Sequence, residues 1–190
     1  MKFVILLILV AVVVLWMVGA FNALIALKNQ VVNAWKQIDV QLKRRHDLIP
    51  NLVNTVKGYM NFERSTLEAV ISARNKAVSA QGVAATAKAE GELTQALGRL
   101  FALSENYPEL KSSQNVLQLQ EELTSTENKI GFARQLYNDV ATQYNTKQAQ
   151  FPTSLVAGVA KASPAELWEI EDAAERGVPN VDLSLDQPKA

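Results

Sequence analysis

The stretch VLQLQEELTSTENKIGFARQLYNDVATQY, residues Val116–Tyr144, decides the fold class. Apolar or small side chains recur in it at alternating spacings of three and four, at Val116, Leu119, Leu123, Thr126, Ile130, Ala133, Tyr137, Val140 and Tyr144. Such a repeat lines one face of an α-helix that packs against other helices, whereas a strand needs a period of two. The pattern therefore predicts a long helix in a coiled-coil-like bundle.

An earlier stretch carries the same repeat, and one charged residue, Arg45, interrupts it. Its members are Val31, Trp35, Ile38, Leu42, Ile49, Leu52, Val56 and Tyr59. Pro50 lies inside this stretch and cannot donate a hydrogen bond to the carbonyl of His46. The chain therefore either kinks at Pro50 within one helix or breaks there into two. The repeat stays in phase after Pro50, which favours a kink.

Turn residues divide the middle of the chain. Ala80-Gln81-Gly82 is the clearest early reversal, and the region of Gly58 is the alternative place for a turn. The alanine-rich segment Val83–Glu92 has little pattern and suits a helix end or a mobile connection. The leucines and phenylalanine of Leu93–Leu103 predict a short helix.

Two proline-containing segments, Asn106-Tyr107-Pro108 and Phe151-Pro152, are expected to end helices, because proline disfavours helical backbone in the residue before it. We therefore predict an all-α fold, an elongated up-and-down bundle of three to four long helices that follows an N-terminal transmembrane helix. The bundle domain is expected over residues 28–152.

Residues 1–27 are predicted to form a transmembrane anchor, because Phe3–Leu27 is almost wholly apolar. A helix of this length reaches about 37 Å, enough to cross the hydrocarbon of a bilayer with some tilt. A cleaved signal peptide is the alternative, with Val18-Gly19-Ala20 as its small-residue cleavage site. The apolar run is longer than a signal core of about 7–15 residues and continues past that site, which favours a retained anchor.

The basic residues predict the orientation of the anchor. Only Lys2 and the α-amino group precede it, whereas Lys28, Lys36 and a basic cluster at residues 43–45 follow it. The positive-inside rule then places the short N-terminus outside and the large domain in the cytoplasm, with the chain crossing the membrane once. A periplasmic domain is the alternative that a lone N-terminal lysine also allows.

The charges are unevenly distributed although the net charge is zero. Residues 28–76 carry nine basic and four acidic side chains, and residues 164–190 carry two basic and seven acidic ones. We expect residues 153–190 to form an acidic C-terminal tail. A short helix from Ser163 to Ala174 is compatible with the cap and the proline that begin it.

Composition excludes several kinds of site. The chain has no cysteine and one histidine, so disulfides, thiolate zinc sites and multi-histidine metal sites are impossible. No phosphate-binding glycine loop is present, and we expect neither a cofactor nor catalysis. With Lys2 set aside, 18 basic residues face 19 acidic ones and no nucleic-acid-reading module is present, so nucleic acid is not an expected partner.

The candidate site residues are polar side chains in or beside the two repeats. Lys43 and Asp47, four residues apart, are expected to pair weakly on a solvated helix face. Arg45 occupies a repeat position, so we expect it to be buried and to need an acidic partner that fixes helix register. Asp39, Glu127 and Asp139 are the candidate partners.

Asn138, Asp139 and Asn145 lie beside the second repeat. They predict either interhelical hydrogen bonds or a surface that faces a partner, and the former is favoured. Asp47 and Asn138 therefore join Asp39, Arg45, Glu127 and Asp139 as residues expected to bind a partner or set the register of the bundle.

A series of short strings runs in order across the soluble segments to Phe151-Pro152: Ala34-Trp35, Ile38–Arg45, Asp47–Val53, Val56–Tyr59, Ala96–Leu100, Tyr107–Lys111, Leu117–Gln120, Thr126–Ile130, Tyr137–Asp139 and Tyr144–Thr146. In these strings the chain resembles the LemA family of bacterial membrane proteins. The resemblance implies an N-terminal transmembrane helix in the inner membrane of a bacterium, a small N-terminus outside and a helical bundle. It implies no particular biochemical activity.

Two functions follow as expectations. The first is a membrane-anchored scaffold or adaptor that binds an unidentified protein partner at the lipid bilayer, because a tether raises the local concentration of a domain near membrane partners. The alternative is a membrane-organising protein that acts by homo-oligomeric self-association and by contact of the basic residues after the anchor with anionic lipid.

Overall fold

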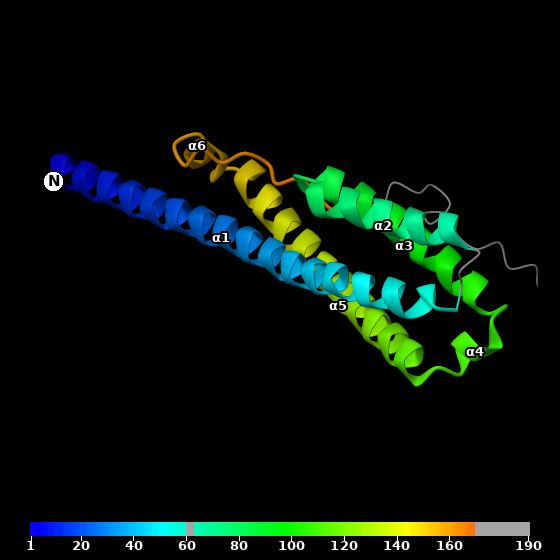
Figure 1. The fold of residues 1–190 in the computed structure, drawn as a ribbon. Coiled ribbons are helices and arrows are strands. Elements are labelled where there is room, and N and C mark those ends of the chain that lie inside the picture. Colours follow the sequence, from blue (N-terminus) through cyan, green and yellow to red (C-terminus); the bar gives the residue numbers. More distant parts are fainter. Residues whose placement is uncertain (60–62, 170–190) are drawn as a thin grey trace, which may run out of the picture.

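The computed structural model describes residues 1–59 and 63–169, and all regular structure within them is helical (Figure 1). This confirms the all-α prediction. The helices are α1 (Lys2–Lys57), α2 (Arg64–Ser79), α3 (Val83–Ser104), α4 (Pro108–Lys111), α5 (Gln114–Ala149) and α6 (Ser154–Ala157).

Helix α1 is one continuous helix that runs from the apolar N-terminus into the bundle and passes through Pro50, as the unbroken repeat predicts. Pro50 itself is exposed. The carbonyl of His46, which Pro50 cannot reach with a hydrogen bond, instead accepts one from Nε of Arg74 on α2, at 2.9 Å. A side chain from a neighbouring helix thus satisfies the backbone group that the proline leaves free.

The chain reverses both after α1 and between α2 and α3. Helix α1 ends at Lys57 and Tyr59 is 42% exposed, so the prediction that the first repeat extends to Tyr59 is wrong and its last buried member is Val56. Residues 80–82 make the second reversal, as predicted. Gly82 has φ +85° and ψ 164° there, a conformation that a side chain strongly disfavours.

The alanine-rich segment Val83–Glu92 is neither a helix end nor a mobile connection. It forms the first half of α3, continuous with the predicted helix at Leu93–Leu103. Burial extends the leucine repeat backwards through this segment, at Thr86, Glu90, Leu93, Leu97 and Leu100. Alanine has the highest intrinsic helix propensity, and two buried polar positions mark the packed face.

The bundle consists of two antiparallel pairs. Helix α5 runs back along α1, and α3 runs back along α2, with the α2–α3 hairpin lying beside the first pair (Figure 1). One hydrophobic cluster joins the end of α1 to α2, α3, α4 and the start of α5, around Leu52, Val70, Leu93 and Leu110. Burial of these apolar surfaces is the main force that holds the four longer helices together.

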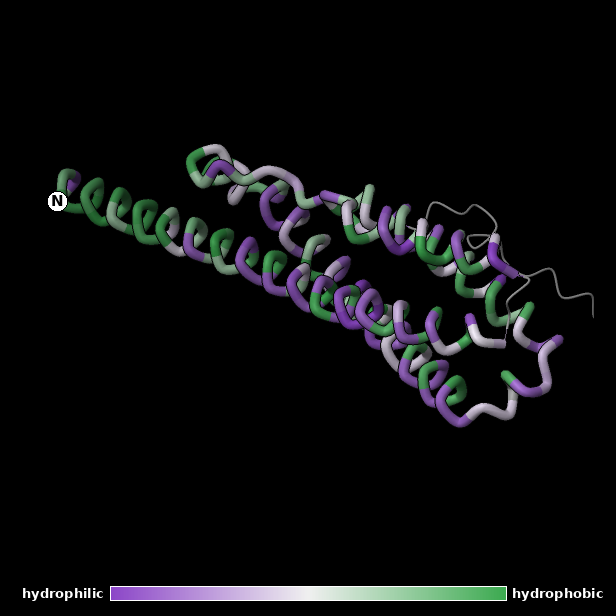
Figure 2. Tube along the Cα trace, in the orientation of Figure 1, coloured by the Kyte–Doolittle hydropathy of each residue, from purple (hydrophilic) through white to green (hydrophobic). Residues whose placement is uncertain are grey.

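A second cluster lies nearer the N-terminus, between the middle of α1 and the end of α5. It includes Leu24, Ile38, Ile130 and Tyr144, and Trp168 packs into it from beyond α6. The apolar part of α1 before this cluster projects alone from the bundle (Figures 1 and 2). Side chains from Phe3 to Val18 are exposed there, and the helix is long and apolar enough to cross a membrane.

The segment after α6 corrects one prediction. The short helix expected from Ser163 to Ala174 is absent over residues 163–169, which are extended and lie against α5; residues 170–174 fall outside the described part of the chain. Side chains of α5 form hydrogen bonds with backbone N–H and C=O groups that would pair with each other in a helix.

Candidate functional site

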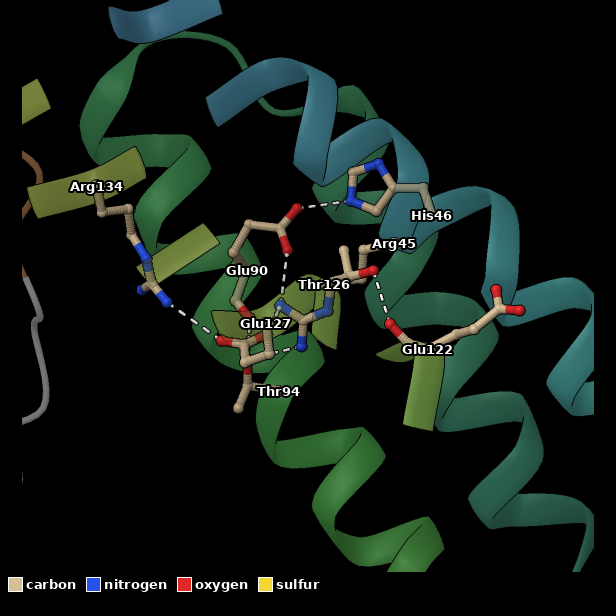
Figure 3. A network of polar contacts seen from close by, with 8 residues as sticks. All are labelled: Arg45, His46, Glu90, Thr94, Glu122, Thr126, Glu127 and Arg134. Atoms are coloured by element: carbon tan, nitrogen blue, oxygen red, sulfur yellow. Dashed lines mark hydrogen bonds and ion pairs between the residues drawn. The ribbon is translucent and has the colours of Figure 1, made fainter. Parts of the chain in front are cut away.

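Arg45 is the centre of a buried polar cluster that joins α1, α3 and α5 (Figure 3). The residue is 4% exposed. Its Nη1 lies 3.2 Å from Oε2 of Glu90 and 3.0 Å from Oε2 of Glu127, and its Nη2 donates to Oγ1 of Thr94 at 2.8 Å. A buried guanidinium needs such partners; the buried carboxylate is that of Glu90, which the sequence did not single out, and Glu127, one of the three candidates, is the partly exposed second partner.

The cluster continues on both sides of Arg45. Nε2 of His46 lies 2.6 Å from Oε1 of Glu90, and Arg134 on α5 contacts Oε1 of Glu127 with Nη2 at 3.2 Å. An ionised carboxylate only accepts hydrogen bonds, so Nε2 of His46 is the donor in this contact when Glu90 is ionised. The cluster thus brings two arginines and one histidine to two glutamates.

The two carboxylates differ in how far they are buried. The Glu90 side chain is 4% exposed and that of Glu127 is 37% exposed. Solvent screens the outer pair, whereas the inner pair interacts in a low effective dielectric. The inner contact between Arg45 and Glu90 joins α1 to α3, and the outer contact with Glu127 joins α1 to α5.

A cleft of about 890 Å³ opens between α3 and α5 above this cluster. Arg45, Glu90 and Trp168 are buried residues that line it, and Gln95 and Gln135 are exposed ones. The cleft is more polar than a typical small-molecule pocket, which is mostly lined by hydrophobic side chains. Its donors and acceptors suit a peptide.

Two asparagines on α5 hold the extended segment next to the cleft. Asn145 donates to the carbonyl of Ala165 at 2.8 Å and accepts from its N–H at 2.7 Å. Asn138 donates to the carbonyl of Trp168 at 2.9 Å and accepts from its N–H at 2.8 Å. Asn138 and Asn145 are seven residues apart on a helix, a rise of about 10 Å. Ala165 and Trp168 are three residues apart in an extended segment, which spans about the same distance, so the two asparagines match the two backbone positions.

The aromatic end of this segment is fixed by three further contacts. The ring of Trp168 packs 6.0 Å from that of Trp35, and the guanidinium of Arg134 lies 5.4 Å from its centroid. The hydroxyl of Tyr137 donates to the carbonyl of Glu166 at 2.7 Å. Burial, and secondly the charge of Glu166, raises the pKa of Tyr137, so its hydroxyl stays protonated as a donor.

The other candidate residues lie outside the cluster. Asp39 is exposed on α1, and Asp139 is exposed at the edge of the cleft, so neither is the partner of Arg45. Asp47 is exposed and pairs with Lys43 at 2.7 Å, as predicted; the hydrogen bond from Lys43 lowers the pKa of Asp47. Asn138 bonds the extended segment, so the expectation of an interhelical bond from it is wrong.

Sequence reasoning missed Glu90, Thr94, Arg134 and Trp168. A signal for Glu90 existed, because continuing the repeat of Leu100, Leu97 and Leu93 backwards places a buried position at residue 90. Trp168 had no local signal, because its burial depends on a segment that folds back from beyond α6. In the described residues no group of three His, Asp or Glu side chains is arranged to hold a metal ion.

The LemA family model matches residues 34–183, which include every residue of the cluster and the extended segment. The chain belongs to the LemA family. This LemA-family chain is 33% identical over 142 residues to Protein LemA of Metamycoplasma hominis, an alignment that covers 74% of this chain and 64% of the relative. With its apolar first helix, the chain is a membrane-associated protein.

Magnetosome proteins are more distant relatives of this LemA-family chain. Magnetosome protein MamQ 2 of Paramagnetospirillum magneticum is 23% identical over 181 residues, covering 82% of this chain and 66% of the relative. Magnetosome protein MamQ of Magnetospirillum gryphiswaldense is 24% identical over 163 residues, covering 72% and 60% respectively. The chain spans less than two thirds of the length of these curated relatives.

Proposed function

We propose that this LemA-family chain is a single-pass membrane adaptor that binds an extended segment of a protein partner in the cleft between α3 and α5. The observation that carries the proposal is the pair of asparagines on α5, each of which holds both polar groups of one backbone unit. Bonds to backbone do not depend on the side chains of the bound segment, so such a face suits an extended peptide.

The cleft extends this binding face. Asn138 and Trp168, which bond each other, both line it, and so do Gln95 and Gln135. Both glutamines are exposed, and each side chain offers a donor and an acceptor. A partner segment laid in the cleft would run on from the resident one and meet the same kind of polar surface.

The proposal places the chain in the bacterial inner membrane, with the short N-terminus outside and the bundle in the cytoplasm. The basic residues that follow the apolar segment support this orientation. It assigns no catalytic role, because the buried cluster pairs its charges with each other. Protease treatment of inverted membrane vesicles should remove the C-terminal tail, and a tail protected there but cleaved in spheroplasts would reverse the orientation.

Photo-crosslinking in cells tests the binding site. We expect p-benzoylphenylalanine in place of Gln95 or Gln135 to yield a discrete adduct with a membrane-proximal protein, and the adduct to weaken when Asn138→Ala is added. Gln118, an exposed glutamine on α5 that does not line the cleft, is the matched control position. Adducts at Gln118 as strong as those at the cleft positions would count against the cleft.

One surface favours the alternative, membrane organisation by self-association. Val40, Phe132 and Leu136 are exposed apolar side chains around a shallow hollow between α1 and α5, and Lys36 and Lys129 border it. If this face joins two copies, Phe132→Ser should abolish energy transfer between differently labelled chains in vesicles. Unchanged transfer, in the presence or absence of anionic lipid, would remove this alternative.

A further inference from the structure

The turn between α5 and the extended segment carries apolar side chains on its outer surface. Phe151 is 81% exposed, Leu155 67% and Val159 71%. The inner surface of the same turn is packed, with Val156 2% and Thr153 5% exposed. Water-facing turns are usually polar, so a turn that is apolar on both sides needs a second apolar environment.

The turn lies beside the end of the apolar segment of α1. Ala157 and Ala160 pack into the cluster that contains Leu24 and Leu27, and α6 contacts both α1 and α5. Figure 1 shows α6 alongside the part of α1 where the helix leaves the bundle, and Figure 2 shows hydrophobic colour on the turn at this level.

The length of the exposed apolar part of α1 determines the level of this turn relative to a membrane. All residues from Phe3 to Gly19 are exposed, whereas Ala20 is the first residue that is half-buried. Residues 3–19 rise only about 25 Å as a helix, and the hydrocarbon of a bilayer is about 30 Å thick. A membrane that covers the whole apolar segment therefore extends past Gly19 to the level of the turn.

We propose that residues 151–159 form a second membrane contact, in which Phe151, Leu155 and Val159 insert into lipid beside the transmembrane part of α1. The exposed Lys28 and Lys161 flank this level and suit the headgroup region, where basic side chains reach anionic lipid. The contact holds the bundle against the bilayer at two points, which fixes the tilt of the bundle relative to the membrane and the height of the cleft above it.

Site-directed spin labelling tests this contact directly, because the chain has no native cysteine. The full-length variants Leu155→Cys and Val159→Cys carry the nitroxide, and Leu117→Cys near the start of α5, 49% exposed, is the matched control. Each is reconstituted in vesicles of phosphatidylcholine and phosphatidylglycerol. All three positions are exposed, so labelling removes no core contact, and helicity is checked by circular dichroism.

We expect oxygen, which concentrates in lipid, to relax the labels at 155 and 159 more strongly than a water-soluble nickel chelate does, and the order to reverse at 117. Labels at 155 and 159 that respond mainly to the nickel chelate would overturn the proposal, since the turn would then be in water. Labels inaccessible to both reagents would also overturn it, because a protein surface would then cover the turn. The readout needs no partner, so it stands or falls separately from the adaptor function.

Discussion

Replacing Arg45 with methionine tests whether the buried cluster organises the bundle. Methionine keeps much of the length of the side chain and removes its charge and its donors. Glu90, whose side chain is 4% exposed, then keeps only His46 as a charged or polar neighbour from α1, while Glu127 keeps Arg134. We expect a large loss of stability, because a carboxylate stays buried after its main counter-charge has gone.

The structure sets the size of the effect. Removing one partner of a buried ion pair lowers the free energy of unfolding by about 3–5 kcal/mol. Because Glu90 keeps its contact with His46, we expect a loss of about 3 kcal/mol here. For a domain of this size, that corresponds to a fall in Tm of roughly 6–12 °C. The coupling between Arg45 and Glu127 should be about 1 kcal/mol or less, because Glu127 is 37% exposed.

Thermal unfolding of the full chain in detergent micelles measures these energies. Near-ultraviolet circular dichroism follows the Trp35–Trp168 contact, and a double-mutant cycle with Glu90→Gln and one with Glu127→Gln separate the two couplings. Arg44→Met is the control, since Arg44 is the exposed neighbour of Arg45 and its replacement should change Tm little.

Two results would refute the reasoning. One is an Arg45→Met variant that is clearly more stable than the parent and still unfolds cooperatively, which would mean that the ion pair does not set the register. The other is a coupling energy of Arg45 with Glu127 that exceeds its coupling energy with Glu90, because the stronger coupling would then not belong to the more buried carboxylate. Joint replacement by Arg45→Met and Glu90→Leu should recover most of the lost stability.

Three further predictions concern single hydrogen bonds and turns. Arg74→Met should lower the free energy of unfolding by about 1 kcal/mol, because the His46 carbonyl loses its hydrogen bond. Pro50→Ala should cancel that loss, because the N–H of residue 50 can then donate to this carbonyl. Urea unfolding of both single variants and of the double variant checks this. The pKa of Tyr137 is raised in the folded state, so its neutral hydroxyl contributes fully to stability below the pKa of about 10 that tyrosine has in the unfolded chain. This contribution is lost as the pH rises through the pKa of the folded state. Tyr137→Phe should therefore remove the dependence of Tm on alkaline pH. Gly82→Ala should cost about 1–3 kcal/mol because φ is +85°, and an unchanged Tm would contradict the strain argument.

The repeats predicted the long helices because helix periodicity is a local property. Alternating spacings of three and four place the buried face on one side wherever the partner lies, so α1 and α5 follow from their own residues. The same logic made Arg45 a buried charge in need of an acidic partner. It could not choose between Asp39, Glu127 and Asp139, because each lies in or beside a patterned segment and their distances from Arg45 depend on how the helices dock.

The predicted helix at Ser163–Ala174 shows the limit of such local reasoning. A cap followed by proline is a sound helix start, yet residues 163–169 are extended because Asn138 and Asn145 bond their backbone. Local propensity is a weak prior that contacts with another element override. Glu90 was missed for a related reason, since an alanine-rich segment shows its packed face only when the leucine repeat after it is extended backwards.

By itself, the sequence determined that an apolar helix leads into packed helices, that Arg45 is buried and that the chain has no thiol chemistry. Each of these depends only on composition or on the spacing of neighbours along one helix. The tertiary structure alone decided that Glu90 shares Arg45, that α5 holds an extended segment and that an apolar turn lies beside the end of the membrane helix. Those features join residues far apart in the chain, and only the free energy of packing the whole bundle determines which of them meet.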